Sequence, residues 1–227
     1  MCGRYSLTSS GEELAEAFDL DPPPAVVPRF NIAPTQPVLA VRLLGPTREA
    51  ALLRWGVGLP INVRSESVGT RGALREAFRE RRCLLPADGF YEWKKGRGGS
   101  QPFHFRRGDR RPFALAGLWS PGVDGALGSC VVLTTEPNAM VAAVHDRMPV
   151  IVAPESYRLW LDPSPGSLVD VQALLRPAAE GGWEAHAVSA AVNSAANDGP
   201  QCQAPAERPR QALLFQDPDP DLSEAKT

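Results

Sequence analysis

The middle of the chain holds a series of short apolar segments with only turns between them, and this feature constrains the fold more than any other. Segments of this length, rich in aromatic and β-branched residues, are typical of β-strands. No long helical pattern separates them, whereas a doubly wound parallel sheet needs a helix after each strand. The pattern therefore favours an α+β fold. The five segments are CLLPA (83–87), GFYEW (89–93), PFHFR (102–106), PFALAGLW (112–119) and SCVVLTT (129–135).

Outside this series, the sequence predicts short helices and further strands. Ser10 and Glu13 have the spacing of a capping box, which predicts a helix over residues 9–18. Residues 21–37 contain too many prolines for a helix or a central strand, so we expect a loop along the surface. The other predicted elements are strands at 37–43, 49–55, 148–152 and 183–189, helices at 70–82, 137–145, 154–161 and 167–175, and a hairpin turn at 94–101.

The charge distribution indicates a local binding face for phosphate. The 227-residue chain has a net charge of −2, but residues 64–111 contain 13 Lys and Arg against 6 Asp and Glu, a net of +7. A basic region on a nearly neutral chain is typical of a protein that contacts nucleic acid locally. A solvated helix over residues 73–82 accounts equally well for some of these arginines.

No segment approaches the ~20 apolar residues of a membrane helix, and MCGRYSLTSS lacks the apolar region of a secretory signal. The cysteines Cys2, Cys83, Cys130 and Cys202 are far apart in sequence, which argues against a disulfide framework and a zinc site. We expect a reduced, cytoplasmic, monomeric protein with no membrane or metal partner, at the nucleoid when bound to DNA. From residue 204 the sequence is acidic and proline-rich, so we expect one domain at 2–203 and a disordered tail at 204–227.

Cys2 directly follows the initiator methionine, which cells remove readily before a small residue. The mature chain would then begin with an α-amine and a thiol on adjacent carbons, a pair that no internal residue has. Taken alone, position 2 is also compatible with an arbitrary residue at a frayed terminus.

Three other segments carry side chains suited to chemistry, and each has a structural alternative. Asn62 in PINVRSE comes shortly after a proline and could be a turn residue. Glu92 in GFYEWKK alternates with two aromatic neighbours, so it could face solvent and pair with a lysine. His145 in AVHDRMP ends a predicted helix, where an imidazolium suits the helix dipole.

Taken in order, these segments resemble the SOS-response-associated peptidase (SRAP) family. The resemblance covers residues 2 to about 202 and departs from the family pattern at Val63, where alanine is commoner, and in a short loop between Trp55 and Asn62. The matching motifs are CGR at Cys2, NIAPTQ at Asn31, WG at Trp55, N-x-R at Asn62, aromatic-Glu-Trp at Tyr91, AGLW at Ala116, HDRMP at His145 and VNSAANDGPQC at Val192.

The resemblance implies a single α+β domain built around a curled, barrel-like mixed sheet with short flanking helices. It implies a sensor that attaches itself covalently to abasic sites in single-stranded DNA and so shields them, without a metal or organic cofactor. The catalytic residues would be Cys2, Asn62, Glu92 and His145. Arg4, Arg64 and Arg147 would grip phosphates, while Pro34, Trp55 and Trp93 would stack on or wedge between bases.

An N-terminal cysteine suits this chemistry because an abasic sugar opens to an aldehyde, with which a neutral amine condenses to a Schiff base. At pH 7 roughly 10% of an α-amine is neutral, against roughly 0.04% of a lysine. The thiol of the same residue can then close a five-membered thiazolidine, a ring closure favoured by proximity. Glu92 would transfer protons at the amine and imine, His145 would act at the sugar oxygen, and Asn62 would orient the amine or sugar.

Two other functions remain open on the sequence. An N-terminal-nucleophile amidohydrolase or peptidase would use the Cys2 amine as base and its thiol as nucleophile. A non-covalent single-strand-binding module would leave Cys2 without a role. An amidohydrolase should turn over a model substrate, and a binding module should leave no covalent adduct.

Overall fold

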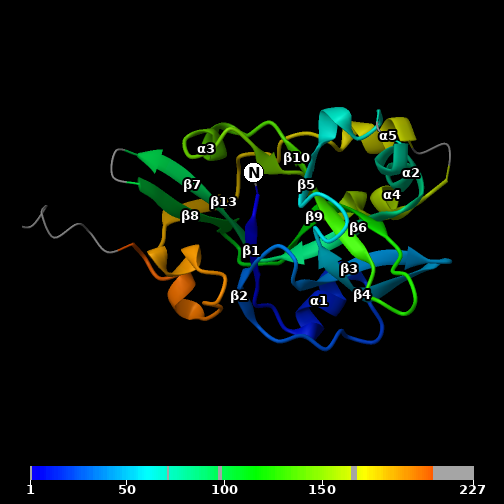
Figure 1. The fold of residues 1–227 in the computed structure, drawn as a ribbon, viewed down its shortest axis with the longest axis horizontal. Coiled ribbons are helices and arrows are strands. Elements are labelled where there is room, and N and C mark those ends of the chain that lie inside the picture. Colours follow the sequence, from blue (N-terminus) through cyan, green and yellow to red (C-terminus); the bar gives the residue numbers. More distant parts are fainter. Residues whose placement is uncertain (1, 71, 97–98, 165–167, 207–227) are drawn as a thin grey trace, which may run out of the picture.

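Eight strands form a sheet that curls until it closes on itself (Figure 1). The computed structural model describes residues 2–70, 72–96, 99–164 and 168–206. The strand order β10-β4-β3-β6-β9 returns to its start, because β10 pairs in parallel with β4 and antiparallel with β9. This ring confirms the predicted α+β fold around a barrel-like sheet. Its strands are β3 (Pro37–Leu44), β4 (Thr47–Trp55), β5 (Asn62–Arg64), β6 (Arg82–Ala87), β9 (Phe113–Ser120), β10 (Ser129–Thr135), β11 (Met148–Pro149) and β12 (Ile151–Val152).

A second, antiparallel sheet of five strands lies beside the ring and carries the chain's N-terminal strand (Figure 1). Its order is β13-β8-β7-β1-β2, so β1 lies between β7 and β2. The strands are β1 (Arg4–Leu7), β2 (Arg29–Ile32), β7 (Gly89–Gly96), β8 (Gly99–Arg107) and β13 (Trp183–Ala187).

The helices are short and flank the sheets. In α1, the Ser10 hydroxyl accepts the backbone N–H of Glu13 at 3.2 Å, and the Glu13 carboxylate accepts that of Ser10 at 2.8 Å. The predicted capping box is therefore present. The α-helices are α1 (Gly11–Phe18), α2 (Gly72–Glu80), α3 (Ala139–Ala142), α4 (Tyr157–Leu161) and α5 (Leu168–Ala173), and the described 3₁₀ turns are η1 (Ser65–Ser67), η2 (Pro154–Ser156), η4 (Ala190–Asn193) and η5 (Pro200–Cys202).

The proline-rich segment 21–37 was expected to be a loop, but it contains β2. The strand occupies a gap between prolines and lies at the edge of its sheet, where the missing N–H groups of nearby prolines break no ladder. The strands β1 and β5 were also missed, because neither is long enough to show an alternating pattern. The predicted strand 148–152 is divided at Val150 into β11 and β12, which pair with different neighbours.

The predicted domain end at residue 203 falls close to an ordered contact. Pro205 forms an isolated antiparallel bridge with Val188, and Ala206 N–H donates to the Ala187 carbonyl at 3.0 Å. The rest of the tail that we expected to be disordered, residues 207–227, lies outside the described residues. Within the described ranges, no helix is both long enough and apolar enough to span a bilayer.

The main core fills the ring and explains some of the basic residues in the middle of the chain. Arg82 is buried, and its guanidinium donates to the carbonyls of Trp160, Phe78, Arg79 and Asp162. This arginine closes helix ends within the core, so part of the basic excess of residues 64–111 belongs to packing.

Candidate functional site

Cys2 lies in the interior of the protein. The residue is 0% exposed, and its carbonyl accepts a hydrogen bond from Asn62 Nδ2 at 2.8 Å. Asn62 begins β5, which pairs in parallel with β10 of the ring. The terminus is thus held against the ring, in contrast to the frayed end that position 2 alone allowed.

Glu92 lies on β7, the strand next to β1. The register pairs Arg4 with Tyr91, so the residues that precede Arg4 run beside Glu92. Glu92 is 1% exposed, which excludes the solvent-facing alternative. The alternating pattern allowed Glu92 to face solvent, but both faces of this part of β7 are covered. Tyr91, on the other face, is therefore buried as well. Burial raises the pKa of Glu92 to about 7.

His145 brings an imidazole to the same carboxylate. Its Nε2 lies 3.8 Å from Glu92 Oε2. Its Nδ1 accepts the backbone N–H of Arg147 at 3.0 Å and lies 3.1 Å from Asp146 Oδ1, so the ring has a partner in either tautomer. Burial lowers the pKa of His145, which favours the neutral ring at pH 7.

These four residues come from four distant segments and form one site with two proton-transfer groups. Burial, followed by the charge of Glu92, raises the pKa of the Cys2 thiol well above its ordinary value. The thiol is therefore protonated at neutral pH and needs a base in order to react. Asn62 Oδ1 is buried and has no hydrogen-bond partner among the described residues, so the amide can accept one more donor beside Cys2.

The structure separates the three arginines that we expected at phosphates. Arg64 is exposed, at the end of β5. Arg147 makes a bidentate ion pair with Glu66, at 2.7 and 2.9 Å, and its guanidinium also donates to the Thr134 carbonyl. This pair lowers the pKa of Glu66 to about 2. Sequence reasoning assigned no role to Glu66, although it lies two residues after Arg64.

Arg4 points into the protein instead of outward. Its guanidinium donates to Asn31 Oδ1 at 2.9 Å and to the Val192 carbonyl at 2.7 Å. Asn31 and Val192 belong to two of the motifs quoted above, for which sequence reasoning named no role. In this structure Arg4 therefore makes internal hydrogen bonds, and its contact with a DNA phosphate stays a prediction.

The expected stacking residues also differ from one another. Trp55 is 0% exposed, and its indole N–H donates to the Ile61 carbonyl at 2.7 Å. In this structure the residue belongs to the core and its ring has no exposed face, so the stacking of Trp55 on a base stays a prediction. Trp93 and Pro34 are half-buried and keep accessible surface.

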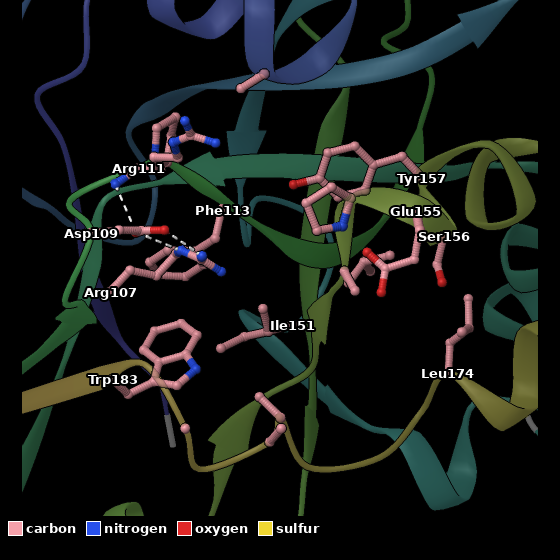
Figure 2. A pocket seen from close by; sticks show the side chains of 18 of the residues that line it. Arg107, Asp109, Arg111, Phe113, Ile151, Glu155, Ser156, Tyr157, Leu174 and Trp183 are labelled. Atoms are coloured by element: carbon pink, nitrogen blue, oxygen red, sulfur yellow. Dashed lines mark hydrogen bonds and ion pairs between the residues drawn. The ribbon is translucent and has the colours of Figure 1, made fainter.

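Two large cavities lie away from these residues. One groove of about 780 Å³ has Trp183 and Arg107 on one side and Tyr157 and Glu155 on the other (Figure 2). It is lined by four arginines and four acidic residues, so it has no net attraction for a polyanion. A second cavity is lined mostly by residues 19–25 and 43–50. Over the described part of the chain, no group of three or more His, Cys, Asp and Glu side chains could hold a metal ion.

The chain matches the profile of a protein family described as "SOS response associated peptidase (SRAP)" over residues 1–195. It is 36% identical over 216 residues to "Abasic site processing protein YoaM" of Bacillus subtilis, which covers 87% of this chain and 95% of that protein. It is 30% identical over 218 residues to "Abasic site processing protein YedK" of Escherichia coli, covering 88% and 97%.

Solved structures show the same architecture. A protein of Bordetella bronchiseptica superposes with a TM-score of 0.69 and 28% identity, covering 83% of this chain and 100% of the other. A protein of Bacteroides thetaiotaomicron superposes with a TM-score of 0.76 over 91% of this chain and 100% of the other. Its sequence identity is 17%, so this second likeness concerns the fold alone.

Proposed function

The chain belongs to the SOS response associated peptidase (SRAP) family, and on that premise we propose that it processes abasic sites in single-stranded DNA by bonding covalently to them through Cys2. The observation that carries the proposal is the convergence of Cys2, Asn62, Glu92 and His145 on one site, in which Cys2 and Glu92 are buried and the other two are half-buried. The printed names of the relatives describe abasic site processing proteins, which supports the choice of lesion.

The bonds formed and broken in the proposed reaction balance. Removal of Met1 frees the Cys2 nitrogen, which is an amide in the full chain and unreactive toward aldehydes. The amine adds to C1 of the open sugar, and the resulting carbinolamine loses water to give an imine. The thiol then adds to the imine carbon, and its proton passes to the nitrogen. The product is a thiazolidine, formed with the release of one water.

Glu92 suits the proton transfers because its pKa is about 7. In its acid form it protonates the carbinolamine hydroxyl so that water leaves. In its base form it accepts the thiol proton, which the raised pKa of Cys2 would otherwise hold on sulfur. A site built for a thiolate nucleophile, as in a cysteine amidohydrolase, would be expected to lower this pKa.

The surroundings of the site suit a DNA backbone without base-specific contacts. Arg64 is exposed, so it can meet a phosphate that flanks the lesion. Arg147 is paired with Glu66, so a phosphate would compete with that carboxylate for its guanidinium. Trp93, half-buried next to Glu92, offers a ring on which a neighbouring base can stack. The lesion has no base, so base readout is not required.

Intact-mass measurement after mixing the Met1-processed protein with an abasic oligonucleotide tests the proposal. We expect one species at the summed mass of both molecules less one water, stable to denaturation. A protein that binds the oligonucleotide but shows no covalent species would instead be a binding module. Cleavage of a model amide without any adduct would assign the amidohydrolase function.

A further inference from the structure

Two sequence motifs contribute no group to the chemistry above, yet the structure joins them: NIAPTQ at Asn31 and VNSAANDGPQC at Val192. We propose that Asn31 and Asp198 are positioning residues, forming a polar clamp that holds residues 192–198 beside β2 and β7 and thereby fixes Trp93 and Arg4 around the Cys2 site. The inference rests on the proposed function, because it concerns how the same site keeps its shape.

Asn31 is the centre of the clamp. The residue is 0% exposed, and its side-chain NH₂ group donates to the carbonyls of Ser194 at 2.9 Å and Asn197 at 2.7 Å, with a longer contact to that of Val192 at 3.2 Å. Its Oδ1 accepts from Arg4 at 2.9 Å. One amide thus binds three backbone carbonyls more than 160 residues away in sequence.

Asp198, within the held segment, makes hydrogen bonds back to β2. Its Oδ1 accepts the backbone N–H groups of Phe30 at 2.6 Å and Asn31 at 2.7 Å, and its Oδ2 pairs with Arg29. Arg29 also donates to Gln36 Oε1 at 2.5 Å. The same oxygen accepts the backbone N–H of Ala33 at 3.0 Å, which fixes the turn that contains Pro34.

Residues 192–198 contact two side chains near the site, those of Trp93 and Arg4. Asn193 Oδ1 accepts the indole N–H of Trp93 at 2.7 Å, which sets the plane of a ring next to Glu92. Arg4, two residues from Cys2, donates to the Val192 carbonyl at 2.7 Å. Val192 also packs with Tyr91 in a small apolar cluster separate from the main core. β1, which follows Cys2, and β7, which carries Glu92, therefore both contact this segment.

The clamp matters because the condensation needs the reacting groups in near-attack geometry. A displacement of these groups by about 1 Å can slow the reaction roughly 100-fold. Residues 192–198 form no long helix or strand of their own, so their position depends on side-chain hydrogen bonds. A buried amide whose donors and acceptor are all satisfied supplies a single defined arrangement.

Asn31→Asp is the sharpest test of the clamp. The substitution keeps the shape of the side chain and the oxygen that accepts from Arg4. It replaces the NH₂ group with a second oxygen, which faces the three backbone carbonyls. We expect amide exchange in residues 192–198 to become at least about tenfold faster. We expect crosslinking at saturating DNA to slow by roughly 10- to 100-fold. Exchange is measured by mass spectrometry on the free protein, so it does not depend on the proposed chemistry.

Asn193→Ala tests the contact with Trp93 at an exposed position where folding is not at risk. We expect the half-saturating DNA concentration to rise about two- to tenfold, the range of one hydrogen bond, while the maximal crosslinking rate stays within about twofold. Ser194→Ala is the matched control in the same segment, since within the described residues its hydroxyl makes only a 3.4 Å contact with Ala196 N–H. It should leave both quantities unchanged.

The outcomes separate the two proposals. Unchanged amide exchange in Asn31→Asp overturns the clamp, and faster exchange with an unchanged crosslinking rate overturns its positioning role. If Asn31→Asp does not fold, an unchanged half-saturating concentration in Asn193→Ala overturns the role instead. If the Met1-processed wild-type protein forms no adduct, the proposed function fails, and the exchange data alone decide whether the clamp exists.

Discussion

The imidazole of His145 and the carboxylate of Glu92 approach within 3.8 Å, one from the loop after α3 and the other from β7. Burial moves their pKa values in opposite directions, raising that of Glu92 to about 7 and lowering that of His145. At neutral pH Glu92 can therefore hold or release a proton at little cost, while the lowered pKa of His145 favours its neutral ring. A carboxyl group that titrates near neutrality beside a neutral imidazole is suited to a reaction that adds and removes protons in successive steps.

The first prediction is a pH optimum for crosslinking. The acid form of Glu92 is present below its pKa of about 7 and lost above it, whereas the neutral α-amine increases up to about pH 8. The rate should therefore peak between about pH 7 and 8. Glu92→Gln should slow crosslinking by ~10²–10⁴-fold and remove the alkaline fall, with DNA affinity nearly intact. Rates from denaturing gels across pH 5–9 check this, and a variant within twofold of wild type would remove Glu92 from the mechanism.

The second prediction concerns His145→Ala. One group should assist both the opening of the sugar and the reversal of the link, so the variant should form its adduct more slowly and release it more slowly. Adduct formation and the decay of purified adduct, followed separately by gel, measure the two rates. A variant slowed in only one direction would limit His145 to that step.

The third prediction separates the amine of Cys2 from its thiol. Cys2→Ala with Met1 removed keeps the amine, so borohydride should trap an imine with the abasic site. Without the thiol, the imine should hydrolyse or permit β-elimination, which cuts the strand. A protein that retains Met1 keeps the thiol but presents an amide, and should bind without crosslinking. Stable crosslinking by a blocked terminus would falsify the thiazolidine mechanism.

The fourth prediction uses the ion pair between Arg147 and Glu66. Arg64→Ala and Arg147→Ala should each weaken single-strand binding and reduce the salt slope by roughly 0.7 per lost phosphate contact, without abolishing crosslinking at high DNA concentration. Glu66→Gln should act in the opposite sense, because it removes the carboxylate charge that pairs with Arg147 and would compete with a phosphate for it. Binding titrations at several salt concentrations measure all three. An affinity unaffected by Glu66→Gln would contradict a phosphate role for Arg147.

The fifth prediction concerns stability and buried His104. Burial, with smaller contributions from His186 and nearby arginines, lowers the pKa of His104 to about 3, against an ordinary value of about 6.5. Below about pH 6.5 His104 binds a proton in the unfolded chain but stays neutral in the folded protein. This histidine should therefore cost about 1.4 kcal/mol of unfolding free energy per pH unit between about pH 6.5 and 3.

Urea unfolding of the wild type and His104→Gln at pH 7 and pH 5 measures that loss, since Gln cannot titrate. The wild type should lose more stability than the variant on acidification, by roughly 2 kcal/mol. Equal losses would show that His104 is protonated in the folded protein.

The local pattern of the sequence determined much of the fold. Consecutive strand segments without intervening helices have to pair with one another, so the α+β class followed from residues 83–135. The capping box at Ser10 likewise depends on residues three apart and was predicted correctly. The motifs around Cys2, Asn62, Glu92 and His145 pointed to the family, because each is a short string of neighbours.

Only the tertiary structure decided what each side chain faces. Trp55 is buried in the core, and Arg4 points inward because residues 192–198 lie beside β2. Glu92 became buried because another segment covers the second face of its strand. Each outcome depends on contacts between residues far apart in sequence, which are set by strand register and chain reversal. Secondary-structure propensity and hydrophobic period depend on residues that are close in sequence. They carry no information about which distant segment packs against a given side chain.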